Sequence, residues 1–322
     1  MHSNHKKNGN STRSNLILAS GVVYKKVTGS YTVHSDGRRL TCSLASQLRK
    51  EPDPVAVGDR VHFHEIQPGQ GSIVEVLPRE NRLARRAPTP MPGSHAFEQV
   101  IVANVGQVVP VFAAANPTPR WNMLDRYLVT AESLDLPALI CITKLDLARD
   151  DSQLYAELQE AASEYRRIGY RVMLVSAFTG EGIAELLEAL AGQVSVFLGK
   201  SGVGKSSLLN ALQPGLGARV NAVSSGELGK GRHTTAHMEM FPLDSTGAIV
   251  DTPGVREFGL WDVDEDDMAL FFPEMRPYVG RCKFGLDCRH DEEPGCAVRK
   301  AVMNGQVSPR RYQSYMKLKE EA

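Results

Sequence analysis

The chain has 322 residues, of which 42% are hydrophobic and 23% charged, and its 37 basic and 37 acidic side chains cancel at neutral pH. This composition is typical of a globular protein of two or three domains and excludes a mostly disordered chain. No apolar run approaches the roughly 18–20 residues of a membrane span, and the short apolar stretch Leu16–Ala19 is no secretion signal, so we expect a cytoplasmic protein.

The charged residues are unevenly distributed along the chain. Residues 1–50 contain nine Lys or Arg against the single acid Asp36, and residues 299–319 contain six basic residues and no acid. Residues 261–274 contain six acids and no base. Basic ends are suited to contact a polyanion such as nucleic acid, although a solubilising tail and a solvated acidic face would give the same pattern.

The N-terminal quarter predicts a disordered tail followed by a small β-barrel. Residues 1–14 are polar without an apolar period, which favours disorder. Residues 15–90 contain short strand patterns up to residue 80, separated by turns such as Asp36-Gly37, and this predicts a closed barrel of the oligonucleotide-binding (OB) type. Such a barrel often binds nucleic acid, but it can also be a spacer. Residues 81–97 are rich in proline and arginine and predict a linker or exposed loop.

Residues 91–260 change to alternating strand and helix patterns, which predict an α/β domain with a mostly parallel sheet covered on both faces. The expected strands are 108–115, 138–143, 171–176, 194–198 and 248–250, and the expected helices are 121–134, 153–167, 182–191 and 205–212. Residues 261–322 form a third, Cys/His-rich region with a helical end at 312–321.

The strongest motif is GKSGVGKS, which fits the phosphate-binding pattern G-x-x-x-x-G-K-[ST] between a strand and a helix. Glycines let the backbone N–H groups turn toward phosphate oxygens, and the following helix adds its positive end. Lys205 should reach the β- and γ-phosphates, and the Ser206 hydroxyl should bind Mg²⁺. The expected nucleotide-binding residues here are Gly199, Lys200, Ser201, Gly202, Val203, Gly204, Lys205, Ser206 and Ser207.

Two further motifs at strand ends are expected to contact the base of the nucleotide. In Thr143-Lys144-Leu145-Asp146, the Asp146 carboxylate can accept hydrogen bonds from N1–H and the 2-amino group of guanine, which adenine does not offer. Lys144 can lay its aliphatic stem along the base. Ser176-Ala177 ends the next strand, where a second loop would touch the base. The four-residue motif alone would more often be an ordinary charged strand end, so it depends on its companions.

The remaining motif elements address Mg²⁺ and the γ-phosphate. Asp251-Thr252-Pro253-Gly254 follows an apolar run, so Asp251 can hold Mg²⁺ through water and the Gly254 N–H can bind the γ-phosphate. The segment 229–235, GKGRHTT, is glycine-rich and carries hydroxyls, as a loop that senses the γ-phosphate requires.

These elements resemble the motifs of a translation-factor-type GTPase, but their order is rotated, because the base motifs precede the phosphate loop. Such a circular permutation is tolerated when the original termini lie close together. A barrel, a permuted GTPase domain and a Cys/His-rich C-terminal region together resemble the ribosome small-subunit-dependent GTPase family over roughly residues 15–315.

The resemblance implies roles for the switch residues. Thr235 would sense Mg²⁺, with Thr234 as its neighbour. His233 would orient the attacking water, because Val255 stands where many GTPases carry a glutamine. One departure is Thr143, where the family usually has an asparagine that bonds both the base and the phosphate loop; this should weaken nucleotide affinity or loosen the base pocket.

The last motif is a cluster of Cys282, Cys288, His290 and Cys296, a set of three thiolates and one imidazole that predicts a closed, structural Zn²⁺ site. The first gap of five residues is wider than in a usual finger, and the family resemblance supports all four ligands. Arg281, Lys283 and Arg289 flank them, which suits a module resting on a phosphate backbone.

The sequence thus predicts a monomeric GTPase that binds GTP with Mg²⁺, holds one structural Zn²⁺ and acts on the small ribosomal subunit and its rRNA without a membrane. By resemblance, hydrolysis would drive release late in subunit maturation. The alternatives are a nucleotide-gated rRNA-binding module with negligible turnover, a regulator of translation on assembled ribosomes, and a P-loop ATPase, which Asp146 opposes.

Overall fold

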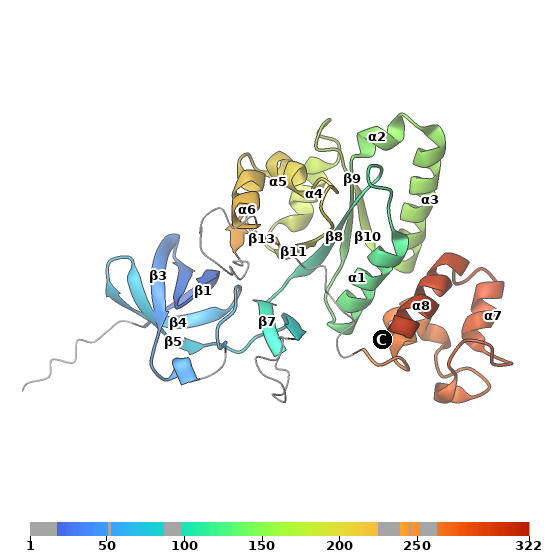
Figure 1. Cartoon of the computed structure of the whole chain (residues 1–322), viewed down its shortest axis with the longest axis horizontal. Coiled ribbons are helices and arrows are strands. Elements are labelled where there is room, and N and C mark those ends of the chain that lie inside the picture. Colours follow the sequence, from blue (N-terminus) through green and yellow to red (C-terminus); the bar gives the residue numbers. More distant parts are fainter. Residues whose placement is uncertain are drawn as a thin grey trace, which may run out of the picture.

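A computed structural model describes residues 18–50, 53–86, 98–224, 239–244, 246–251 and 263–321. Three parts follow one another along the chain, and Figure 1 shows them side by side: a β-barrel, a central α/β domain and a helical C-terminal domain. Within these residues, no helix combines the length and the apolar character needed to cross a membrane.

The N-terminal part is the predicted closed barrel, with strand order β1-β2-β3-β5-β4. Its strands are β1 (Leu18–Val27), β2 (Ser30–Ser35), β3 (Arg38–Leu44), β4 (Arg60–Gln67) and β5 (Gln70–Val76), with a short 3-10 turn at Leu48–Lys50. Alternate side chains such as Val33, Phe63 and Ile73 fill the interior. A closed five-stranded barrel is the architecture of an OB fold, so this expectation is confirmed.

The expectation of a linker at 81–97 is wrong for its first half. Arg82–Arg86 form strand β6, which pairs antiparallel with β7 (Glu98–Ala103). The strand forms because Leu83 is fully buried against Val102. This burial holds the arginine-rich segment in β-pairing with β7. The ribbon joins the barrel through the Ala103 N–H, which donates to Val57 O at 2.9 Å.

The central domain contains a six-stranded sheet of order β10-β9-β8-β11-β13-β12. All neighbours are parallel except β12 and β13, so the predicted mostly parallel sheet is confirmed. The three-residue edge strand β12 was not predicted, because it is too short to show a pattern. The strands are β8 (Gln107–Ala113), β9 (Leu139–Thr143), β10 (Arg171–Leu174), β11 (Val194–Leu198), β12 (Met240–Pro242) and β13 (Ala248–Asp251).

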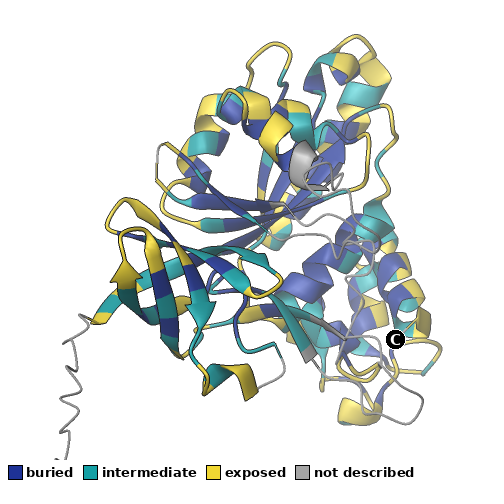
Figure 2. Ribbon diagram, turned by 60° about the vertical axis from the view of Figure 1, so that its left-hand side comes forward, coloured by how far each residue is buried: buried dark blue, intermediate teal, exposed yellow. Residues whose placement is uncertain are grey.

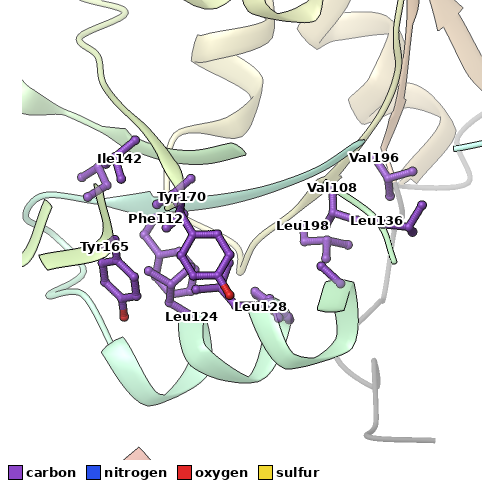
Figure 3. Close-up of a cluster of buried hydrophobic side chains, with 14 of the residues drawn as sticks. Val108, Phe112, Leu124, Leu128, Leu136, Ile142, Tyr165, Tyr170, Val196 and Leu198 are labelled. Atoms are coloured by element: carbon purple, nitrogen blue, oxygen red, sulfur yellow. The ribbon is translucent and has the colours of Figure 1, made fainter. Parts of the chain in front are cut away.

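Helices cover both faces of this sheet. In β8, Val108 and Phe112 face one apolar core and Val109 and Val111 face the other, because successive side chains of a strand point to opposite faces. Figure 3 shows the first core, where Leu124 of α1 packs with Phe112. The helices are α1 (Trp121–Ser133), α2 (Leu145–Arg149), α3 (Ser152–Ile168), α4 (Ile183–Leu190), α5 (Lys205–Leu212) and α6 (Leu216–Ser224). Figure 2 shows buried residues concentrated along the sheet and on the inward sides of the helices.

The C-terminal domain packs against α1. It contains 3-10 turns at Met268–Phe271, Arg276–Tyr278 and Gly285–Asp287, followed by α7 (Ala297–Met303) and α8 (Pro309–Glu321). Val129 of α1 belongs to the same apolar cluster as Phe272 and Tyr315. Through Val129, α1 therefore contributes to the core of the C-terminal domain.

Two charged segments have a role that their sequence did not suggest. Arg311, from the basic segment predicted to contact a polyanion, is fully buried and donates to Asp125 of α1 at 2.6 Å. Its other nitrogens bond both oxygens of Glu274, at 2.6 and 3.0 Å, and Glu274 belongs to the acidic segment expected to be a solvated face. These charges are paired inside the domain interface. Asp264 to Asp267 do remain exposed.

Candidate nucleotide site and metal centre

The predicted motifs meet at one edge of the central sheet. The phosphate loop follows β11, the Thr143-to-Asp146 motif follows β9, Ser176 follows β10, and Asp251 ends β13 in register with Phe197. The carboxyl ends of parallel strands form the usual ligand-binding edge of such a sheet. Segments more than a hundred residues apart in the chain therefore lie along a single edge.

The phosphate loop has the backbone shape that its glycines allow. Gly202 and Gly204 adopt φ values of +85° and +91°, which side chains rarely tolerate. A Cβ on Gly199 would lie 2.6 Å from Val111 O, whereas one on Gly202 would meet nothing within 4 Å. The loop is thus packed tightly at its base and open at its crown, which fits a nucleotide's phosphates.

The side chains of the loop divide between the interior and the surface. The Lys205 ammonium donates to Gly199 O at 2.5 Å, across the loop from its own helix α5. Val203 is buried and Ser206 is half-buried at the first turn of the helix. Lys200, Ser201 and Ser207 are exposed. Lys205 and Ser206 therefore stand where phosphate and Mg²⁺ contacts are expected.

Thr143 ties the base side of the site to the phosphate side. Its buried hydroxyl has two carbonyl acceptors, Val203 O in the phosphate loop and Phe112 O at 3.2 Å. A hydroxyl carries one hydrogen, so none remains to donate to a base. Thr143 thus makes the phosphate-loop bond expected of an asparagine, and its hydroxyl hydrogen is already used within the protein.

Lys144 lies across the same loop. Its residue adopts φ +56°, and its ammonium donates to Gly202 O at 2.7 Å and to Asn116 O. The methylene stem passes so close to Gly204 that a Cβ there would lie 3.6 Å from Lys144 Cε. The stem is therefore held in place as an apolar surface beside the phosphate loop.

The two base motifs meet directly. The Ser176 hydroxyl donates to Asp146 Oδ1, and the Ser176 hydroxyl oxygen accepts from the backbone N–H groups of Phe178 and Thr179 at 3.2 and 3.1 Å. Ser176 is buried, while Asp146 and Ala177 are partly exposed. The bond from Ser176 thus orients the Asp146 carboxylate, which stays partly exposed to solvent.

Several predicted residues lie outside the described part of the chain. These are His233, Thr234, Thr235 and Gly254, and for Asp251 only the backbone is described. Their roles stay predictions.

The four predicted metal ligands come together in the C-terminal domain. One ligand atom each from Cys282, Cys288, His290 and Cys296 lie within 4.8 Å of one another, and all four residues are buried. Cys282 Sγ is 3.4 Å from His290 Nδ1 and 3.9 Å from Cys296 Sγ. Sulfur atoms on a tetrahedral Zn²⁺ stand about 3.8 Å apart, given Zn–S bonds of about 2.3 Å, so the donor set fits such an ion.

Hydrogen bonds from neighbouring residues hold these ligands and their loop in place. Backbone N–H groups of Ala297 and Arg299 point at Cys282 and Cys296 at 3.2 and 3.4 Å. Tyr312 of α8 donates to His290 O at 2.6 Å and fixes the loop that carries this ligand. Burial raises the pKa of the Cys296 thiol and lowers the pKa of His290, so a bound cation must displace thiol protons but meets a neutral imidazole.

Comparison with known proteins gives the family of the chain. The family model described as RsgA GTPase matches residues 76–261, which include every nucleotide motif. The small ribosomal subunit biogenesis GTPase RsgA of Gemmatimonas aurantiaca is 44% identical over 94% of this chain and 97% of its own length. The chain belongs to the RsgA GTPase family.

Solved structures extend the RsgA likeness to the whole architecture. The crystal structure of YjeQ from Thermotoga maritima has a TM-score of 0.78 at 33% identity and covers 95% of this chain and 98% of its own. YloQ, described as a circularly permuted GTPase, has a TM-score of 0.73 at 29% identity and covers 98% and 97%. The permuted motif order read from the sequence is therefore the order of this fold.

Sequence reasoning missed three features of the loops around these motifs. Asn116, whose carbonyl receives the Lys144 ammonium, follows β8 in a proline-containing loop without a motif. Arg149 pairs with Glu181 and joins α2 to the loop after Ser176. Phe178 in that loop is 89% exposed. An aromatic residue directly after Ser176-Ala177 was a signal that could have been noticed.

Proposed function

We propose that this chain hydrolyses GTP in a cycle that couples binding of the small ribosomal subunit to its late maturation and ends in release. The observation that carries the proposal is the pairing of Asp146 with Ser176 on the sheet edge that also holds the phosphate loop. An oriented carboxylate beside a phosphate cradle suits a guanine nucleotide, and curated relatives are named small ribosomal subunit biogenesis GTPases.

The residues divide the chemistry as follows. Asp146 would accept from the N1–H and the 2-amino group of guanine, and Lys144 would lay its stem against the base. Lys205 would neutralise the β- and γ-phosphates, and Ser206 with Thr235 would bind Mg²⁺. When bound, Mg²⁺ offsets charge that develops on the phosphate oxygens.

His233 would orient the attacking water as a general base. The motif that follows β13 offers Val255 at the glutamine position, and valine can neither donate nor accept. Asp251 and Gly254 would respond to Mg²⁺ and to the γ-phosphate. Loss of that phosphate would then release the segment that leads into the C-terminal domain.

The partner surfaces follow from charge. Three basic residues stand beside the metal ligands and would contact rRNA phosphates: Arg281, Lys283 and Arg289. Zn²⁺ would be the structural ion of that domain. The barrel would hold rRNA from a second side. The chain would act in the cytoplasm as a monomer, because the small subunit supplies the partner surface.

GTP hydrolysis with and without purified small subunits tests the proposal. Wild-type turnover should rise with subunits, and Lys205→Ala and Ser206→Ala should each abolish it. A nucleotide-gated RNA-binding module would instead bind subunits in a GTP-dependent way without any stimulated turnover. Normal turnover in both variants would refute the phosphate-loop assignment.

A further inference from the structure

Phe178 is the most exposed large hydrophobic side chain among the described residues, at 89% exposure. It follows Ser176-Ala177 directly, in the loop between β10 and α4. The neighbours Thr179, Gly180 and Glu181 are polar or small. An aromatic ring contributes nothing to stability there, because it is not removed from water.

The loop that carries this ring is fixed to the base-reading elements. The Phe178 N–H donates to the Ser176 hydroxyl oxygen, which is the group that bonds Asp146. Gly180 closes the turn through its N–H to Ser176 O at 2.9 Å. Glu181 pairs with Arg149 of α2, the helix that begins beside Asp146. These contacts link the backbone of Phe178 to Asp146 through Ser176.

The base would need cover on two faces. A purine is a flat ring with two apolar faces, and its edge is what Asp146 can read. The Lys144 stem, held by Gly202 O and Asn116 O, supplies one apolar wall. Phe178 follows Ser176, the residue that bonds Asp146, by two positions, and its ring is 89% exposed.

We propose that Phe178 stacks on the bound guanine base and, with the Lys144 stem, sandwiches it. This inference rests on the proposed function, since it requires a guanine nucleotide at Asp146. Stacking of a base on an aromatic side chain contributes about 1–3 kcal/mol by alanine substitution, which corresponds to roughly a 5- to 150-fold change in affinity. The effect belongs to the base and is independent of the number of phosphates.

Calorimetric titration of the full chain with GDP and with a non-hydrolysable GTP analogue tests the stacking. Phe178→Ala should weaken both nucleotides by the same factor, about 5- to 150-fold, while Phe178→Tyr keeps the ring and should bind like wild type. Met303→Ala is the matched control, because Met303 is 79% exposed on the C-terminal domain. The melting temperature without nucleotide should be unchanged in all three variants.

The outcomes separate this inference from the proposed function. Unchanged affinity in Phe178→Ala would overturn the stacking while leaving a guanine site in place. An equal loss in the alanine and tyrosine variants would also overturn it, because the aromatic ring would then not be the cause. Failure of wild type to bind either nucleotide would refute the proposed function itself.

Discussion

The buried ion pair between Arg311 and Asp125 should hold the C-terminal domain on α1. Both side chains are 0% exposed and 2.6 Å apart, and Arg311 also lies 4.5 Å from the Phe272 ring centroid. Arg311→Ala leaves the buried carboxylate of Glu274 without its cation and leaves Asp125 with Arg310, at 3.7 Å, as its remaining cation. Breaking a buried pair in this way costs about 3–5 kcal/mol.

The same interface contains a matched control. Arg276 pairs with Glu132 of α1 at 2.9 Å, but these side chains are 51% and 22% exposed. Exposed pairs contribute about 0.2–1 kcal/mol, so Arg276→Ala should be several times milder. The comparison separates burial from the mere presence of an ion pair between the two domains.

Urea unfolding followed by tryptophan fluorescence measures the difference. Trp121 of α1 lies 5.6 Å from the Arg310 guanidinium, so it reports on this interface, and Trp261→Phe removes the only other tryptophan. In that background, Arg311→Ala should lower the free energy of unfolding by about 3–5 kcal/mol, and Arg276→Ala by at most about 1. Equal effects of the two variants would refute the reasoning.

Four further predictions concern the nucleotide and metal sites. Asp146→Asn should weaken GTP by about 10- to 150-fold and gain xanthosine triphosphate, because an amide can donate to the xanthine 2-carbonyl; unchanged GTP affinity would show that Asp146 does not read the base. Thr143→Val should weaken GDP by about 2- to 13-fold through loss of the bond to Val203 O, Thr143→Ser should restore it, and equal binding by both would contradict the tether. His233→Ala should lower kcat by about 10²–10⁴-fold with GTP binding nearly intact, whereas a comparable loss of affinity would indicate a structural role. Cys288→Ser should lose the metal, keep basal hydrolysis and lose subunit stimulation; a metal-free variant that is fully stimulated would rule out coupling through this domain.

Motifs with strict spacing could be predicted from the sequence. The phosphate loop requires glycines at fixed positions, so residues 199–206 were recognisable. The four metal ligands were recognisable because three cysteines and a histidine are clustered in the sequence. The alternation of buried strands with amphipathic helices likewise predicted the doubly covered sheet. These features are local, and the chain shows them within a few residues.

Features that depend on contacts between distant segments could not be predicted. Arg311 and Glu274 each look like ordinary surface charges, and only the packing of the C-terminal domain on α1 makes them a buried pair. Leu83 lies in an arginine-rich segment, and its strand forms because Val102 receives it. The Thr143 bond to Val203 O spans sixty positions. From the sequence alone, threonine in place of the family's usual asparagine therefore suggested only weaker nucleotide binding.

The rate of GTP hydrolysis by the purified full chain, measured with and without purified small ribosomal subunits, tests the account most directly. We predict slow basal turnover that the subunits accelerate, with no acceleration by large subunits and no competition from ATP at matched concentration. Turnover that is the same with and without small subunits, or that ATP abolishes, would contradict it.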